Sequence, residues 1–245
     1  MEPVELRRTA DMKDLKKPTV VLGFPGTGLV GSVAASHLID VLQLKFGGYI
    51  TSSDFAPLAA IHDYTPMPAA RLHYSEKYNI VVIISEMTIP VGSSKDLAEK
   101  ILVFANSVKA TSVVSLGGIS LKEGGKEVYV VSSDLPIIKD VMKRKIAKPI
   151  KEGATTGVTG VLLAKGTLAK YPVTAFLAEA SEEYLDPGAA VNVLKVLSRF
   201  LNIPIDTAGL EKEAKELSKG LKESIIKSRI SKKGGTAAEG GSMYG

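Results

Sequence analysis

The sequence predicts an α/β protein whose mostly parallel sheet is flanked by helices, with a C-terminal helix and a flexible tail after it. Three observations predict this. The chain opens with an apolar strand, a glycine-rich turn and an amphipathic helix; apolar strands then alternate with helical segments; and the composition changes after residue 206. Strands and helices that alternate in this way are typical of a parallel sheet covered on both faces. With 245 residues, the chain is long enough for one large domain or two small ones.

The first elements follow a charged start. Residues 1–17 show no periodicity, and we expect them to be a surface arm or a poorly ordered stretch. Residues 19–22 are β-branched and apolar, which is typical of a buried strand, and apolar residues recur at helical spacing over 29–44. The segment 46–78, which contains a glycine pair and three prolines, predicts two or three short strands or an irregular excursion.

The remainder of the body alternates regularly. Apolar runs predict strands, and apolar residues three and four apart predict helices. Asp186 and Pro187 stand where a helix N-cap and a first helical residue are expected. The strands are expected at 80–84, 112–116, 126–131 and 173–177, and the helices at 96–108, 135–145, 157–169 and 187–200.

Composition excludes several kinds of site. The chain has no cysteine, so a disulfide framework, a thiolate metal site and a cysteine nucleophile are ruled out. His37, His62 and His73 are scattered without ligand spacing, and we expect neither a metal nor a cofactor. No apolar stretch resembles a signal peptide or a transmembrane helix, so we expect a cytoplasmic protein.

The basic character of the chain is concentrated near its C-terminus. The net charge is +5, and residues 207–233 contain eight lysines and arginines against four glutamates. The body is therefore close to neutral, and we expect no nucleic-acid partner. Binding of nucleic acid by the basic segment remains an alternative, although Tyr244 is the only aromatic ring after Phe200.

We divide the chain into an α/β domain (1–206), a C-terminal amphipathic helix (207–230) and a flexible tail (231–245). The tail contains five glycines, a composition typical of flexible linkers. The helix carries a narrow apolar seam, which we expect to pack at a subunit contact or on the body. The seam consists of Leu210, Leu217, Leu221 and Ile225.

The turn Gly26-Thr27-Gly28-Leu29-Val30-Gly31 has the spacing of a dinucleotide-binding fingerprint, between a predicted strand and a predicted helix. Such glycines let a pyrophosphate approach the N-terminus of a helix. The acidic residue expected about 20 positions later is missing, because Asp40 lies in the predicted helix and Asp54 in a turn. Close helix–sheet packing requires the same glycines and is the interpretation we favour; a nucleotide- or NAD-binding enzyme is the alternative.

No catalytic set is visible in the body. A P-loop would need Gly-Lys-Ser/Thr, but Leu29 follows Gly28. The stretch 118–122 lacks the final glycine of a hydrolase elbow. Glu86, at the end of a strand, is more typical of a cap or an ion-pair partner, and the histidines have no nucleophile to serve. We therefore predict that the protein is not an enzyme.

The last three residues combine the features of a docking peptide. Met243 offers an apolar anchor, Tyr244 an amphipathic ring and Gly245 the terminal carboxylate. Peptides of this kind bind pockets that have apolar walls and a basic group.

Three blocks resemble one known family. Val20–Gly31, Val113–Gly118 and Tyr184–Ala190 are similar, in the same order, to the proteasome-assembly-chaperone family in its archaeal form. The ending Met243-Tyr244-Gly245 matches the hydrophobic–tyrosine–any-residue motif with which such chaperones and the proteasomal ATPases dock on the proteasome α-ring.

The resemblance implies a fold like that of the nucleoside phosphorylases without their catalytic residues. It also implies a homo-oligomer, with a tetramer favoured and a pentamer as the alternative, whose tails enter pockets between α-subunits where the carboxylate meets a lysine. The outcome would be assistance to proteasome assembly or ATP-independent opening of the α-ring gate. Met243 is softer than the usual Leu, Ile or aromatic residue, so several tails on one oligomer would compensate for low affinity per tail.

Overall fold

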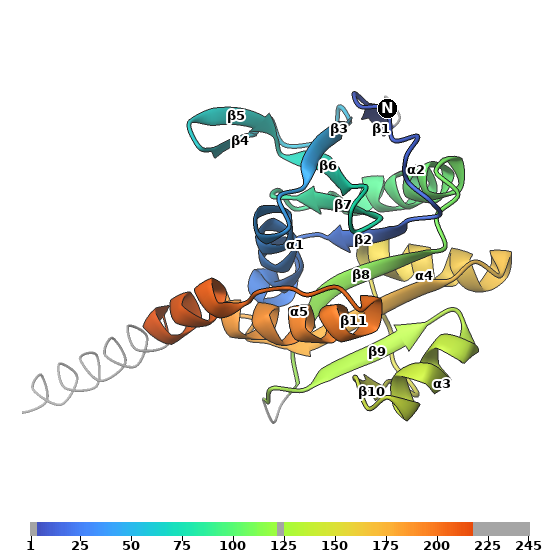
Figure 1. The fold of residues 1–245 in the computed structure, drawn as a ribbon, viewed down its shortest axis with the longest axis vertical. Coiled ribbons are helices and arrows are strands. Elements are labelled where there is room, and N and C mark those ends of the chain that lie inside the picture. The colour runs from blue at the N-terminus through green and yellow to red at the C-terminus, as the bar shows by residue number, and fades with distance from the viewer. Residues whose placement is uncertain (1–3, 122–124, 218–245) are drawn as a thin grey trace, which may run out of the picture.

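A nine-stranded sheet runs through the protein and carries helices on both faces (Figure 1). The computed structural model describes residues 4–121 and 125–217. The strand order is β1-β3-β6-β7-β2-β8-β11-β9-β10, and the predicted α/β class is confirmed. The four central strands are parallel: β7 (Ile80–Ser85), β2 (Thr19–Gly23), β8 (Ser112–Ile119) and β11 (Val173–Glu179).

Outside this parallel centre the direction of the strands changes. On one side, β6 (Ala70–Ser75), β3 (Lys45–Thr51) and β1 (Glu5–Arg8) follow one another in antiparallel order. On the other side, β9 (Val128–Ser132) is antiparallel to β11, and the short β10 (Lys148–Pro149) is parallel to β9.

The N-terminal stretch corrects one expectation. Residues 1–17 were predicted as a surface arm or a poorly ordered start, whereas β1 pairs with β3 and forms an edge of the sheet. Val4, Met12 and Leu15 are buried in the core beneath it. An edge strand can bury a few apolar residues and keep its charged side chains in solvent. The high charge of residues 1–17 therefore gave no pattern that predicts a strand.

The segment 46–78 contains more strands than predicted. Besides β3 and β6 it forms β4 (Ala59–His62) and β5 (Thr65–Pro68), which among the described strands pair only with each other. This hairpin, residues 59–68, stands clear of the main sheet at the upper left of Figure 1. Its two-residue turn has positive φ at both Asp63 (45°) and Tyr64 (65°), the geometry of a tight hairpin turn.

The sheet divides the core into two layers. On one face, α1 (Val30–Val41) and α5 (Pro187–Leu201) pack with α3 (Leu135–Lys143) at the end of the sheet; on the other lie α2 (Ser94–Ser107) and α4 (Gly157–Ala169). Successive residues of β2 alternate between the two layers, since Val21 belongs to the first and Val20 and Leu22 to the second. Among residues 4–121 and 125–217, no helix combines the length and apolar character needed to cross a membrane.

Candidate functional site

The docking residues predicted from the sequence, Met243, Tyr244 and Gly245, lie outside the described residues, as do Leu221 and Ile225 of the predicted seam. The structure does describe the start of the C-terminal segment, up to residue 217. The side chain of Asp186 caps α5 by accepting a hydrogen bond from the amide of Ala189 (2.9 Å), as predicted. After α5, residues 208–217 are helical and extend to the left in Figure 1.

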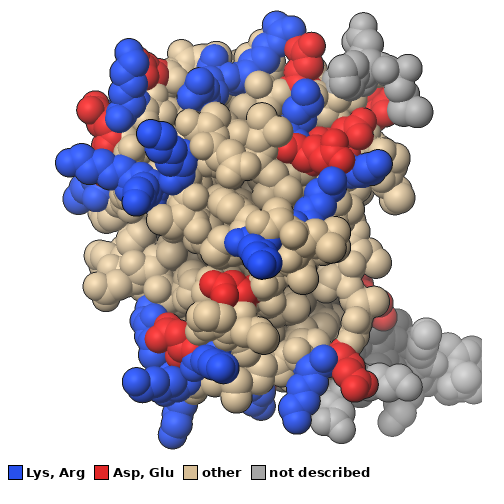
Figure 2. Space-filling view, turned by 90° about the vertical axis from the view of Figure 1, so that its right-hand side faces the viewer, with Lys and Arg blue, Asp and Glu red and all other residues tan. Residues whose placement is uncertain are grey.

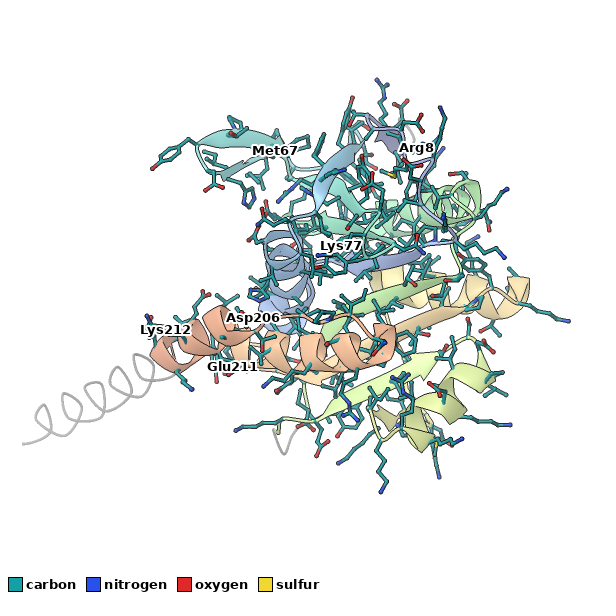
Figure 3. The ribbon with its side chains drawn as sticks, viewed as in Figure 1. Arg8, Met67, Lys77, Asp206, Glu211 and Lys212 are labelled. Carbon is teal, nitrogen blue, oxygen red and sulfur yellow. The ribbon has the colours of Figure 1, made fainter. Side chains whose placement is uncertain are left out.

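This C-terminal helix is anchored to the body at its first turn. Leu210 is buried in the layer formed by α1 and α5, whereas Leu217 is exposed. Lys195 of α5 forms an ion pair with Glu211 (2.8 Å), and the imidazole of His37 on α1 lies 2.7 Å from the carbonyl oxygen of Asp206. Asp206 and Glu211 are labelled at this junction in Figure 3. The described part of the seam thus packs on the body through Leu210.

The second candidate from the sequence, the glycine turn, lies between β2 and α1. Gly28 has φ +61°, and a Cβ atom placed there would lie 2.9 Å from the Cβ of Ala180. A Cβ on Gly31 would lie 2.5 Å from the carbonyl oxygens of Leu116 and Phe24. Gly26 alone of the three has open space, with nothing within 4 Å. The geometry supports the packing interpretation for Gly28 and Gly31, because protein atoms already fill the space beside them.

A cavity of about 440 Å³ opens next to this turn, at the carboxyl ends of the central strands. This is where open α/β sheets bind ligands when they have one. Its lining is rich in hydroxyls, including Thr27, Thr88, Ser94 and Ser120, and Glu182 is the one charged side chain among the described residues that line it. Hydroxyls can accept and donate hydrogen bonds, but the described lining residues include no lysine, arginine or histidine that could pair with a phosphate or transfer a proton.

A partly buried polar cluster around Arg71 lies at the base of the β4–β5 hairpin. The guanidinium of Arg71 on β6 holds the carboxylate of Glu86 with two contacts, Nη1–Oε2 (3.0 Å) and Nη2–Oε1 (3.1 Å). The Nε2 atom of His62 on β4 lies 2.8 Å from Oε1 of Glu86. Glu86 is thus an ion-pair partner, one of the two roles favoured from the sequence.

The cluster shifts two pKa values. Burial alone would raise the pKa of Glu86, but hydrogen bonds and charge from Arg71, together with His62, outweigh it and lower that pKa. His73 accepts a hydrogen bond from Nε of Arg71 (3.2 Å), and burial followed by the nearby Arg71 charge lowers the pKa of His73 to about 4. Sequence reasoning missed Arg71, although an arginine inside the apolar run 69–74 was the available signal.

The surface in Figure 2 bears on the nucleic-acid alternative. On this face, lysines and arginines are interspersed with acidic side chains toward the top and bottom, and uncharged side chains cover much of the middle. The described residues on this face form no continuous basic stripe of the kind that follows a phosphate backbone.

The fold and the filled glycine turn together define an open-sheet α/β protein that carries a helical C-terminal extension. The chain belongs to the PAC2 family, whose sequence model matches residues 20–225. The uncharacterized protein MJ0106 of Methanocaldococcus jannaschii is 30% identical over 210 residues, which is 86% of each chain.

Solved structures agree with this family. PbaA of Pyrococcus furiosus, an archaeal homolog of proteasome-assembly chaperone, superposes with a TM-score of 0.83 at 26% identity, covering 96% of this chain and 97% of PbaA. PbaB of the same organism, an archaeal proteasome activator, shares the fold with a TM-score of 0.80 at 24% identity, covering 91% of this chain and 99% of PbaB.

Proposed function

We propose that this protein is a proteasome assembly chaperone or ATP-independent proteasome activator that docks on the proteasome α-ring through Met243, Tyr244 and Gly245. The observation that carries the proposal is the PAC2 match over residues 20–225 in a chain that ends in a hydrophobic–tyrosine–any-residue motif. The likeness to PbaA, a homolog of proteasome-assembly chaperone, supports the same partner.

The three docking residues have separate roles in this proposal. Met243 fills an apolar pocket between neighbouring α-subunits, because its flexible thioether adapts to irregular walls. The ring of Tyr244 adds apolar area and its hydroxyl a hydrogen bond. Gly245 supplies the terminal carboxylate, which pairs with a lysine of the ring.

The remainder of the chain presents this peptide. Residues 1–206 act as a homo-oligomeric body, with a tetramer favoured over a pentamer, and 207–230 form a helical stalk. Residues 231–245 give a reach of about 20 Å if they behave as a flexible linker. Several tails on one oligomer bind more tightly than one tail, because each bound tail raises the effective concentration of the others.

The proposal assigns no catalysis to the body. Its support is the packing at Gly28 and Gly31 and a cavity whose described lining residues include no lysine, arginine or histidine. A nucleotide- or NAD-binding enzyme remains the alternative, since Gly26 has open space at the cavity.

The test compares Tyr244→Ala with the full chain in a pull-down of purified α-rings and of complete proteasomes. Tyr184→Ala is the matched control, since Tyr184 is a half-exposed tyrosine of the body. We expect Tyr244→Ala to lose binding, with its fold and oligomeric mass unchanged, and Tyr184→Ala to keep it. Binding by Tyr244→Ala at the level of the full chain would show that the tail is not the docking element.

A second measurement separates the two roles. Added to complete proteasomes, an activator raises the hydrolysis of a fluorogenic peptide without ATP, whereas an assembly chaperone raises the yield of rings from free α-subunits. Loss of either effect in Tyr244→Ala identifies the role that depends on the tail.

A further inference from the structure

The β4–β5 hairpin exposes apolar side chains that nothing in the described chain covers. Tyr64 at its tip is 100% exposed and Ile61 is 73% exposed, and Leu58 beside it is about half exposed. The hairpin projects from the body, and its side chains, with Met67 labelled, extend into the space around it (Figure 3). A two-stranded hairpin with no further strand or helix is marginal in water, so a covering partner would stabilise it.

The tip is also unfavourable for the isolated chain. Tyr64 has φ +65°, a conformation that costs a bulky residue about 1 kcal/mol relative to glycine. No packing within the described chain offsets this cost, because the ring of Tyr64 is fully exposed. A tyrosine at this position is understandable when its ring is used in a contact with another molecule.

The charge of this region differs from that of the whole chain. Residues 46–70 contain no lysine or arginine, although the chain has 31, and their two acidic residues are Asp54 and Asp63. Asp63 lies in the turn beside Tyr64 and is exposed. The hairpin therefore presents an aromatic ring and a carboxylate side by side.

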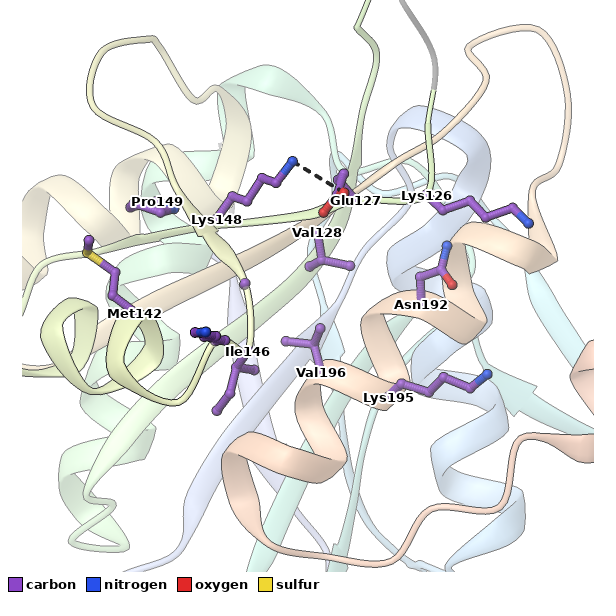
Figure 4. A pocket seen from close by; sticks show the side chains of 12 residues that line it. Lys126, Glu127, Val128, Met142, Ile146, Lys148, Pro149, Asn192, Lys195 and Val196 are labelled. Atoms are coloured by element: carbon purple, nitrogen blue, oxygen red, sulfur yellow. Dashed lines mark ion pairs between the residues drawn. The ribbon is translucent and has the colours of Figure 1, made fainter.

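A groove of complementary character lies on another part of the molecule, between β9, β10, α3 and α5 (Figure 4). It has a volume of about 490 Å³, within the range of binding pockets. Val128 of β9, Ile146 and Val196 of α5 form its apolar floor, and four lysines against one glutamate form its rim. The lysines are Lys126, Lys145, Lys148 and Lys195.

The four lysines differ in their ion pairs within the described residues. Lys148 pairs with Glu127 (3.2 Å) and Lys195 with Glu211 (2.8 Å). Lys126 and Lys145 are exposed and form no ion pair within the part of the chain that the structure describes. We call this groove, with these four lysines and its three apolar residues, the lysine groove.

We infer that the β4–β5 hairpin of one chain binds in the lysine groove of a second copy, with Tyr64 on the apolar floor and Asp63 against Lys126 and Lys145. Charge complementarity identifies the occupant: the groove is basic, and the hairpin is an exposed apolar segment of the same protein that carries Asp63 and no lysine or arginine. The inference deepens the homo-oligomer of the proposed function and rests on it.

The hairpin cannot reach the groove of its own chain. It leaves the sheet between β3 and β6, whereas the groove adjoins β9 and β10, at the opposite end of the strand order. Five strand spacings separate β6 from β9, about 24 Å, and each strand of the hairpin is only about 14 Å long. Binding between two different surfaces of one chain is heterologous, so repetition forms a closed ring when the rotation between copies allows it.

The experiment measures mass by light scattering in the absence of any proteasome, so its outcome is independent of tail docking. Tyr64→Gly removes the ring and suits the positive φ, so the hairpin should stay folded. Lys126→Glu with Lys145→Glu reverses the free charges of the groove without touching its floor. Leu168→Ala is the control, because Leu168 is 86% exposed and lies outside both surfaces.

We expect the wild type and Leu168→Ala to be multiples of the 25.9 kDa chain and each of the two surface variants to be single chains. Mixed in equal amounts, the two variants should form a complex of two chains, because one intact hairpin meets one intact groove. Asp63→Lys added to the groove variant should restore assembly in part, by exchanging the charges.

Four results would overturn the inference. These are a monomeric wild type, surface variants that keep the wild-type mass, a groove variant that assembles while the hairpin variant does not, and a mixture that remains monomeric. The third would indicate contact between two hairpins. Any of them leaves the α-ring pull-down with Tyr244→Ala as a separate test of the proposed function.

Discussion

The glycine turn and the β4–β5 hairpin differ in whether a sequence motif marks them and in whether their space is filled by protein atoms. The turn has the spacing of a known ligand-binding motif, yet protein atoms lie 2.5 to 2.9 Å from where side chains of Gly28 and Gly31 would begin. The hairpin has no motif, yet it exposes Tyr64 completely. Glycines in the spacing of a ligand-binding motif can be required for close packing alone. Exposed side chains that could contact another molecule can lie in a segment whose sequence shows no motif.

The largest effect expected from this comparison concerns stability at the turn. Gly31→Ala places a Cβ against two backbone carbonyl oxygens that cannot move aside cheaply, and should lower the free energy of unfolding by about 2–3 kcal/mol. Gly26→Ala is the matched control and should change it by less than about 1 kcal/mol. Urea denaturation measures both, and equal losses would contradict the packing interpretation.

The base of the hairpin should give stability a dependence on pH. The pKa of His73 is lowered from 6.5 to about 4. Between pH 4 and pH 6.5, His73 is therefore mostly protonated in the unfolded chain and mostly neutral in the folded chain. The contribution of neutral His73 is therefore complete above pH 6.5 and is lost as pH falls toward 4, by about 2 kcal/mol at pH 5.

His73→Gln should flatten this dependence in urea denaturation at pH 7 and pH 5. An unchanged dependence in His73→Gln would show that another group is responsible.

A smaller effect is expected at the tip of the hairpin. Under conditions where the chain is monomeric, Tyr64→Gly should change the free energy of unfolding by less than about 1 kcal/mol, because relief at positive φ offsets the entropy of glycine. Thermal unfolding at low protein concentration measures this. A loss of several kcal/mol would mean that the ring of Tyr64 packs within its own chain.

The smallest effect is expected from ligands at the cavity beside Gly26. NAD, NADP, ATP and nucleosides should leave the melting temperature unchanged, because the described lining holds no cation for a phosphate. A rise with any of them that Gly26→Ala reduces would favour the enzyme alternative.

The sequence predicts the centre of this fold well and its periphery poorly. The four parallel strands are buried on both faces and their helices on one, so continuous apolar runs identify the strands and helical spacing identifies the helices. β1, β4 and β5 bury little, and their sequences follow no period that separates them from loops. Arg71 was missed for a different reason, since its role depends on Glu86, which follows the neighbouring strand β7, and on His62 from the hairpin.

For the candidate sites, the sequence and the structure identify different residues. Met243, Tyr244 and Gly245 are predicted from the sequence alone and lie outside the described residues. The lysine groove and the exposed hairpin could be found only from the structure, because each joins residues far apart in the chain or depends on exposure.

Docking of the last three residues on the α-ring can be measured as the binding constant for purified α-ring. The full chain is compared with a chain that ends at Ser242, both checked for equal oligomeric mass. We expect binding by the full chain and a loss of at least about 100-fold without Met243-Tyr244-Gly245, because every tail of the oligomer is then removed. Equal binding by both chains would contradict this expectation and place the interface on the body.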